Sequence, residues 1–254
     1  MTQTPLGHNP VTLLGMRVDR VTMDESLALV ESYIAERKPR HILTADASMV
    51  VTAKEDADFA AIAANADLVT PDGAGILWAT KRQGNPVTAK VSGVVLAERL
   101  VALSAVKGWR VFFFGAAPGV AEEARARMLA KYEGANIVGH RDGFFSADNE
   151  AEVLNEIRAA KPDILLVALG IPKQEKFIHK HKAALEVPVL IGVGGTFDVM
   201  SGTVRRAPIW MQNAGLEWLH RLAANPKKIS KVAMLPQFVR MVIMEKRSPA
   251  SPVG

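Results

Sequence analysis

Apolar residues recur along this chain in two alternating patterns. Short runs of consecutive apolar, β-branched or aromatic residues are typical of buried strands, and they occupy residues 41–44, 67–70, 110–114, 136–139, 163–169 and 187–193. Segments with apolar residues at helical spacing lie between these runs, at 24–36, 49–65, 75–83, 94–106, 120–132, 150–160 and 174–184. Strands that alternate with helices predict a parallel sheet covered by helices on both faces, an α/β fold.

The length of the chain limits its domain organisation. A chain of 254 residues with 49% hydrophobic content supports one α/β domain or two tightly packed halves. We find no internal repeat and no low-complexity linker. We therefore expect a core over 11–220, built from two βαβ halves that meet near Lys107-Gly108 without being independent domains. Residues 1–10 and 248–254 are expected to be disordered.

Composition indicates the compartment. The chain has no cysteine, so it has neither a disulfide framework nor a cysteine nucleophile, and the cytoplasm is the natural setting. The first ten residues do not match a signal peptide. No apolar stretch approaches the roughly 20 residues that a membrane-spanning helix needs.

The positive charge is concentrated near the C-terminus. Residues 227–247 hold six Lys or Arg residues and one Glu, which accounts for the whole net charge of +5. Apolar residues alternate with these basic ones, which is typical of a segment that lies on an anionic membrane surface rather than of a nucleic-acid partner. We expect 221–247 to be a basic amphipathic appendage that folds on membrane contact. The alternative is an ordinary packed pair of terminal helices with a solvated charged face, and a homo-oligomer would also bury the apolar face.

Candidate chemistry begins where the strand at 164–169 ends. Gly170, Ile171 and Pro172 follow it, and a helix then starts with Lys173, Gln174 and Glu175 in its first turn. Ligands of open α/β sheets bind at this carboxyl edge of the strands. Glu175 is explained by capping of the helix, whereas Gln174 gains little there and is better explained by directed hydrogen bonding.

Two other strands end in polar residues. Asp72 lies between Pro71 and Gly73, which fix the turn, so its carboxylate could act as a general base; the alternative is a turn former that caps its own backbone. Thr44 and Asp46 could bind a sugar hydroxyl or a phosphate, or could cap the helix expected at Met49.

Glycine-rich turns and arginines are candidate phosphate sites. Backbone N–H groups of Gly194-Gly195-Thr196 and of the turn 115–119 could cradle phosphate oxygens. Neither turn is a GxGxxG or Walker motif. Arg206 and Arg221 suit phosphate contacts, or solvation and a pair with Glu217.

No metal site is expected. Asp56-Ala57-Asp58 has the DxD pattern of metal-dependent sugar transferases, but it falls inside the predicted helix 49–65 and we interpret it as a chance match. His179 and His181 are two positions apart on a helix, so their side chains point apart.

These residues together resemble the WecG/TagA/CpsF family of bacterial glycosyltransferases, from about Leu13 to about Arg240. The resemblance is carried by several short segments in order: Thr44 with its following loop, 66–73, 91–93, 170–175, 192–198, 206–208 and 215–218.

The resemblance implies a Rossmann-like core of the GT-E type with a mobile C-terminal appendage. It implies an inverting, metal-independent enzyme without a cofactor, peripheral on the cytoplasmic face of the plasma membrane. Such an enzyme moves a sugar from a UDP-sugar donor to an undecaprenyl-diphosphate-linked acceptor for teichoic acid or other surface polysaccharide. The sugar is N-acetylmannosamine, its uronic acid or another hexose.

By position, the resemblance makes Asp72 the catalytic base, with Thr44 and Gln174 in the same pocket. The remaining substrate-binding positions that it implies are Asp46, Gly73, Lys173, Glu175, Gly194, Gly195, Asp198, Arg206, Arg221, Lys228 and Lys231. The last three belong to the appendage that would close over the diphosphate.

This chain departs from the family pattern in two ways. The loop is Thr44-Ala45-Asp46 where the family usually has Thr-x-Asn, so the recognised sugar could differ. Lys also replaces Arg at two appendage positions, which loses bidentate phosphate geometry. Two other functions compete: a NAD-type oxidoreductase, which the missing GxGxxG disfavours, and a non-catalytic membrane scaffold that binds sugar nucleotides.

Overall fold

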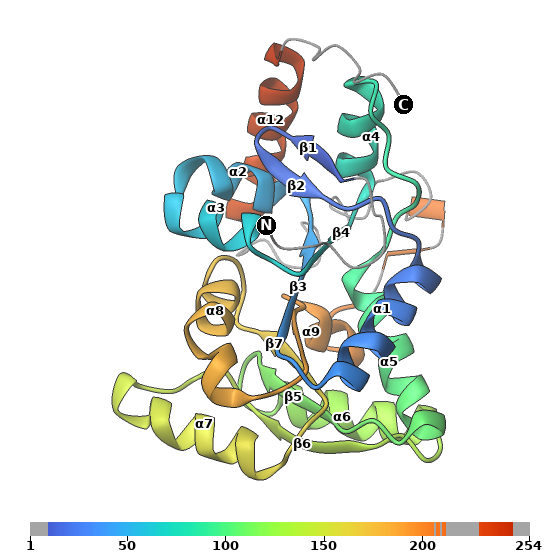
Figure 1. Ribbon diagram of the computed structural model, residues 1–254, viewed down its shortest axis with the longest axis vertical. Coiled ribbons are helices and arrows are strands. Elements are labelled where there is room, and N and C mark those ends of the chain that lie inside the picture. The colour runs from blue at the N-terminus through green and yellow to red at the C-terminus, as the bar shows by residue number, and fades with distance from the viewer. Residues whose placement is uncertain (1–9, 206, 209, 212–228, 246–254) are drawn as a thin grey trace.

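A single parallel sheet forms the centre of the protein (Figure 1). The computed structural model describes residues 10–205, 207–208, 210–211 and 229–245. The six strands are ordered β4-β3-β8-β7-β5-β6, and every neighbouring pair is parallel. Their bounds are β3 Arg40–Ala45, β4 Leu68–Pro71, β5 Val111–Gly115, β6 Ile137–Arg141, β7 Ile164–Ala168 and β8 Val189–Gly192. This confirms the predicted Rossmann-like α/β core.

Helices cover both faces of the sheet. One face packs against α1 Met23–Glu36, α5 Gly93–Lys107, α6 Val120–Lys131 and α9 Thr196–Met200. The other face packs against α2 Ala47–Glu55, α3 Ala57–Ala64, α7 Glu150–Ala159 and α8 Lys173–Leu185, with a 3₁₀ turn at Ala147–Asn149 before α7. Successive strand residues point to opposite faces: Phe113 joins one cluster of buried side chains, and Phe112 and Phe114 join another.

The strand order joins distant parts of the chain. β8 is the last strand in sequence, yet it lies between β3 and β7. The expected halves on either side of Lys107-Gly108 therefore share one continuous sheet. Gly108 ends α5 in the left-handed conformation at φ 71°, which glycine adopts without strain.

Local patterns account for most element boundaries, but one long predicted helix was wrong. Residues 49–65 form two helices, α2 and α3, because Asp56 leaves the helical conformation and accepts a hydrogen bond from the Phe59 N–H at 2.9 Å. Asp56 also pairs with Lys176 at 2.6 Å. The DxD match therefore straddles a helix start, and its first carboxylate has a structural role.

Two strands and one α-helix were absent from the sequence prediction. Strands β1 Val11–Leu13 and β2 Met16–Val18 form an antiparallel hairpin that buries Leu13 and Val18. Leu14 and Gly15 make its tight turn, both with positive φ, as a two-residue hairpin requires. The third, α9, is only five residues long, too short for periodicity to detect.

The C-terminal helix packs against the body of the protein. Helix α12, Ile229–Met244, lies against α2 and buries Phe238 and Val242 in the cluster that also contains Ile76 of α4, Ala74–Arg82. The expectation that the tail folds only on membrane contact therefore does not hold for α12. Its inward apolar face is core, as the packed-helix alternative stated. Among the described residues, no helix is long and apolar enough to cross a membrane.

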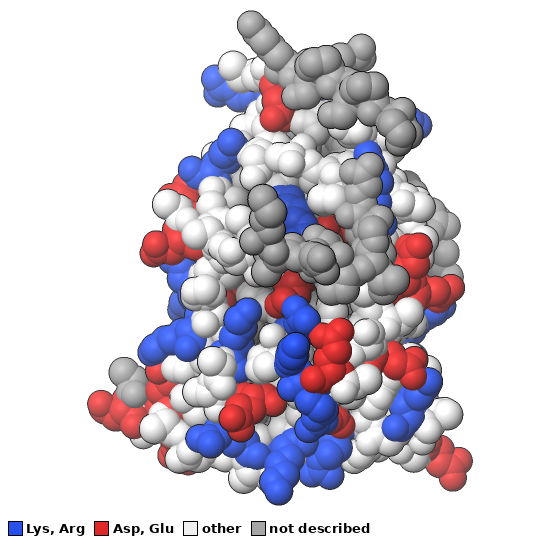
Figure 2. Space-filling view, in the orientation of Figure 1, with Lys and Arg blue, Asp and Glu red and all other residues white. Residues whose placement is uncertain are grey.

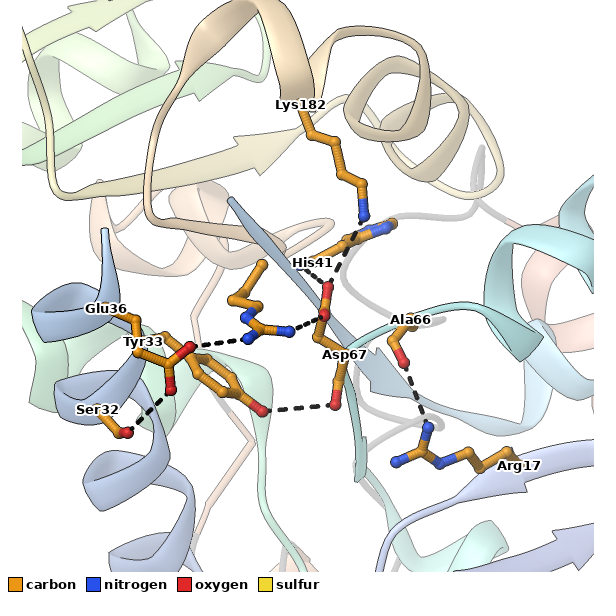
Figure 3. Close-up of polar contacts among 9 residues, drawn as sticks. Arg17, Ser32, Tyr33, Glu36, His41, Ala66, Asp67 and Lys182 are labelled. Carbon is orange, nitrogen blue, oxygen red and sulfur yellow. Dashed lines mark hydrogen bonds and ion pairs between the residues drawn. The ribbon is translucent and has the colours of Figure 1, made fainter. Parts of the chain in front are cut away.

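A polar network supports the sheet at the amino ends of its strands (Figure 3). The Asp67 carboxylate accepts hydrogen bonds from the His41 N–H at 2.8 Å and from Arg40 at 3.0 Å. Lys182 of α8 lies 3.8 Å from the same carboxylate. Burial and the nearby Asp67 raise the pKa of Tyr33 to about 12, so its hydroxyl stays neutral and donates to the Asp67 carbonyl at 3.5 Å. This network stabilises the edge opposite the candidate site.

Candidate active site

Asp72 is held at the carboxyl end of β4 by the start of α5. Its Oδ2 accepts a hydrogen bond from the Gly93 N–H at 2.9 Å, and its own N–H donates to the Ala45 carbonyl at 2.8 Å. Gly93 is the first residue of α5, so the positive end of a 15-residue helix faces the carboxylate. Asp72 is partly exposed. The alternative was that Asp72 caps the backbone of its own turn. It does not account for Oδ2, because the N–H that Oδ2 binds belongs to Gly93, 21 residues further along the chain.

Thr44 and Asp46, which follow each other closely at the end of β3, have different roles. The Thr44 hydroxyl is largely buried and donates to the Gly192 carbonyl at 3.1 Å. Asp46 caps α2, accepting from the Met49 N–H at 3.0 Å and the Ser48 hydroxyl at 2.6 Å. The capping interpretation is confirmed for Asp46, and the helix begins two residues earlier than predicted, at Ala47.

Gln174 and Glu175 form a buried pair beneath the end of β8, with exposed fractions of 1% and 0%. Gln174 Oε1 accepts from the N–H groups of Gly170 at 3.2 Å and Gly194 at 3.0 Å. Its Nε2 donates to Glu175 Oε1 at 2.7 Å. The two N–H donors and the carboxylate together fix which way the amide points. We call this arrangement the Gln174 clamp, because it holds the turns after β7 and β8 together.

The clamp confirms that Gln174 makes directed hydrogen bonds, although its partners are backbone groups and Glu175. The Glu175 carboxylate lies fully buried in the first turn of α8, whose N-cap residue Pro172 makes no side-chain cap; that Glu175 gains from the helix N-terminus stays a prediction. Gly192 makes room for the pair. A Cβ atom there would lie 2.6 Å from both Gln174 Nε2 and Glu175 Oε1.

Close contacts connect these groups along one edge of the sheet. Asp72 binds the Gly93 N–H, the Cα of Gly93 faces Thr44, Thr44 binds Gly192, and Gly192 packs on Gln174. Asp72 follows β4, Thr44 lies near the end of β3 and Gly192 is the last residue of β8, and these three strands are neighbours in the sheet. Two strand spacings amount to roughly 10 Å. Asp72 and the helix start that carries Gln174 therefore lie on the same rim.

A cleft of about 1210 Å³ opens beside this rim, above the ends of β5, β7 and β8. Four predicted substrate-binding residues line it: Lys173, Gly194, Gly195 and Asp198. Asp72, Thr44 and Asp46 are not among its lining residues, so the predicted residues fall into two adjoining groups. Arg206, Arg221 and Lys228 lie outside the described residues, as does the side chain of Lys231.

Three lysines line the cleft along α8. Lys173, Lys176 and Lys180 are spaced i, i+3 and i+7, so they share one side of the helix. Lys176 is paired with Asp56 and Lys180 with Glu150. Lys173 is exposed and has no ion pair with a described residue. Together with the backbone of the Gly194 turn, this ammonium group is suited to binding an anion.

Aromatic residues that were not predicted from the sequence line the same cleft. Phe144 is 72% exposed, while Phe145 and Phe177 contact each other with ring centres 6.3 Å apart. His181 lies beside Phe177, and burial lowers its pKa although Glu150 opposes that shift. The available sequence signal was a pair of Phe residues directly after the turn Asp142-Gly143.

Charge on the visible face is mixed. Figure 2 shows Lys and Arg side chains interspersed with Asp and Glu rather than in one continuous basic patch. In the part of the chain that the structure describes, no group of three His, Asp or Glu side chains is arranged to hold a metal ion.

Comparison with known proteins identifies the family. The model of the Glycosyl transferase WecG/TagA/CpsF family matches residues 11–252, nearly the whole chain. The chain belongs to this family of glycosyltransferases. The protein is therefore an enzyme, and neither the oxidoreductase nor the scaffold interpretation describes it.

Relatives of this glycosyltransferase share most of its length. One from Bacillus spizizenii is 35% identical over 224 residues, 88% of this chain and 86% of the relative. One from Bacillus subtilis is 31% identical, covering 87% and 85%. One from Staphylococcus aureus is 28% identical and covers 93% of both. All three are named N-acetylglucosaminyldiphosphoundecaprenol N-acetyl-beta-D-mannosaminyltransferase.

Proposed function

We propose that this glycosyltransferase moves N-acetylmannosamine, or a closely related sugar, from a UDP donor to an undecaprenyl-diphosphate-linked N-acetylglucosamine. The relatives carry that acceptor and that sugar in their names. The product would enter the synthesis of a surface polysaccharide. The observation that carries the proposal is Asp72, a partly exposed carboxylate oriented by a helix start on the rim beside a large cleft.

The proposed reaction is a single displacement with inversion. The acceptor hydroxyl attacks the anomeric carbon and gives its proton to Asp72, while the bond from that carbon to the diphosphate oxygen breaks and UDP leaves with the electron pair. Lys173 and the N–H groups at Gly194 and Gly195 would stabilise the negative charge on the diphosphate. Asp198, also in the cleft, would bind the nucleoside.

The predicted residues outside the cleft divide into contacting and positioning roles. Thr44 and Gly73 lie beside Asp72 and would shape the sugar subsite. Gln174 and Glu175 are buried, so in this proposal they act through the Gly194 turn rather than by touching the sugar. Asp46 is partly exposed although it caps α2, and it would contact a hydroxyl of the sugar.

The basic appendage would complete the donor site. Arg221, Lys228 and Lys231 are proposed to close over the diphosphate and Arg206 to contact it from the core, which would supply positive charge without a divalent ion. Because the acceptor carries a polyprenyl chain, we place the enzyme at the cytoplasmic face of the plasma membrane. Unchanged turnover in EDTA is the expected result for the metal-free route.

Asp72→Asn tests the proposed base. We expect transfer to fall by at least about 100-fold, because removal of a general base costs 10²–10⁴. Asp24→Asn is the matched control, since Asp24 is an exposed carboxylate of α1 whose ion pair with Arg99 contributes little. The donor is identified by mass spectrometry with a panel of UDP-sugars, and inversion by the anomeric configuration of the product. Full activity in Asp72→Asn would refute the mechanism.

A further inference from the structure

Helices α4 and α12 stand together at one end of the protein, opposite α7 (Figure 1). The rings of Trp78 on α4 and Phe238 on α12 have centres 6.5 Å apart. Gln83, directly after α4, donates a hydrogen bond to Glu245, directly after α12. Phe238 and Val242 are buried, so core packing explains why they are apolar. Core packing does not explain the apolar residues that remain exposed on these two helices.

The outer face of the pair combines large apolar and cationic side chains. Each helix contributes three exposed residues at positions i, i+3 and i+4, a spacing that places them on one side of a helix. They are Trp78, Lys81 and Arg82 on α4, and Arg240, Ile243 and Met244 on α12. We call these six residues the α4/α12 face. Its apolar members are well exposed: Trp78 40%, Ile243 53% and Met244 68%.

The charge of the α4/α12 face is available to a partner. Lys81, Arg82 and Arg240 form no ion pair with any described residue, whereas most Lys and Arg side chains on the other described helices are paired. Glu245 is the one nearby acid among the described residues of these two helix ends, and it accepts from Gln83. An anionic partner is therefore favoured.

We propose that the α4/α12 face docks the enzyme on an anionic phospholipid bilayer. The inference rests on the proposed function, because a lipid-linked acceptor requires contact with a membrane. Trp prefers the boundary between headgroups and acyl chains, Ile243 and Met244 supply apolar surface for shallow insertion, and the three cations attract anionic headgroups. The docking surface thus includes a helix of the core, not only the basic tail.

The position of α4 connects this surface to the chemistry. α4 begins two residues after Asp72, and Trp78 is six residues after it. Trp78 is four residues beyond Ala74, the first residue of α4, so it lies roughly 6 Å further along the helix axis. A bilayer held at the outer end of α4 would therefore present the sugar diphosphate of an embedded acceptor close to the proposed base.

Vesicle flotation tests the proposal. One probe is a vesicle of phosphatidylcholine alone. The other is a vesicle in which about 30 mol% of the lipid is the anionic phosphatidylglycerol. We expect Lys81→Ser/Arg82→Ser to lower the partition coefficient on the anionic vesicles by about 25-fold, since each basic residue near the surface is worth about fivefold. Trp78→Ser should weaken binding to both kinds of vesicle.

Matched controls lie elsewhere on the surface. Lys38→Ser/Arg158→Ser removes two exposed cations that have no ion pair with a described residue, and Val106→Ser removes an apolar side chain of α5 that is 83% exposed. Both controls should bind vesicles as the unaltered enzyme does. Equal losses in the control and the α4 variants, or no loss in the α4 variants, would overturn the proposal.

Transfer assays with two different acceptor substrates distinguish a failure of the docking proposal from a failure of the proposed function. The Lys81/Arg82 variant should transfer sugar slowly to an acceptor embedded in vesicles and at the normal rate to a water-soluble short-chain sugar diphosphate. Loss on both acceptors would overturn the docking role and place α4 in the active site. A change from dimer to monomer with vesicle binding intact would overturn it in favour of self-association. If the unaltered enzyme uses neither acceptor, the proposed function fails while the flotation result still decides the docking role.

Discussion

Replacement of Gln174 by Glu converts the buried Gln174 clamp into a pair of carboxyl groups. The new carboxylate could still accept from the Gly170 and Gly194 N–H groups, so the turns keep their hydrogen bonds. The atom that now donates to Glu175 Oε1 at 2.7 Å would become a second acceptor. Gln174→Glu therefore tests electrostatic complementarity at one atom pair, with almost no change in volume.

The expected cost follows from that distance. Two ionised carboxylates with oxygens 2.7 Å apart repel by about 6 kcal/mol at an effective dielectric constant of ~20. Protonating one of them restores a hydrogen bond, and for a glutamate of ordinary pKa this costs about 4 kcal/mol at pH 7. Protonation costs less than the repulsion, so the variant takes up a proton. We therefore expect a loss of about 4 kcal/mol in the free energy of unfolding. Since the folded variant binds the extra proton, the penalty should shrink to about 1 kcal/mol at pH 5.

Urea denaturation at pH 7 and pH 5 measures both values. The exchange variant Gln174→Glu/Glu175→Gln is the control, because it again places one amide beside one carboxylate and should recover more than half of the loss at pH 7. Donor turnover should follow the recovery in stability, since the exchange variant removes the repulsion between the two carboxyl groups beneath the Gly194 turn. A penalty that is equal at both pH values, or an exchange variant as unstable as Gln174→Glu, would refute the proposed pairing.

Three further predictions concern other parts of the fold. His41 is buried, and desolvation lowers its pKa to about 3, so the unfolded chain binds a proton at this residue at a higher pH than the folded chain does. The free energy of unfolding should therefore drop by about 2 kcal/mol from pH 7 to pH 5 relative to His41→Leu. The same pH dependence of stability in both proteins would contradict this. Gly93→Ala brings a Cβ to 2.9 Å from Thr44 Oγ1 and should lower turnover roughly tenfold, whereas Gly75→Ala, whose Cβ makes ordinary contacts, should not. Phe238→Ala should cost about 3–5 kcal/mol in chemical denaturation because its ring is fully buried; a loss under about 1 kcal/mol would show that α12 does not depend on this contact.

Much of the fold was predictable because helix and strand periodicities are local. The six sheet strands and the helices between them follow from runs and spacings within about fifteen residues, and Pro and Gly mark several of their ends. The break at Asp56 shows the limit: an alanine-rich segment is compatible with one long helix, and a cap with an ion pair to Lys176 on α8 stabilises two.

The candidate site was predicted in kind but not in arrangement. Asp72 directly after a strand indicated a group at the carboxyl edge, and Gln174 indicated directed hydrogen bonds. That Asp72 is oriented by Gly93 could not be predicted, because the two residues meet through the packing of α5. The clamp likewise needs Gly192 and Gly194, which β8 brings beside Gln174.

The sequence by itself determined the α/β class, the polar residues at strand ends and the family, since each depends on local patterns or on motifs in order. The tertiary structure decided the position of β8 between β3 and β7, the burial of Glu175, and which face of α12 is core. A local pattern specifies that a surface is apolar, but not what covers it. For α12, the contacts with α2 bury one face and leave Ile243 and Met244 exposed at the surface.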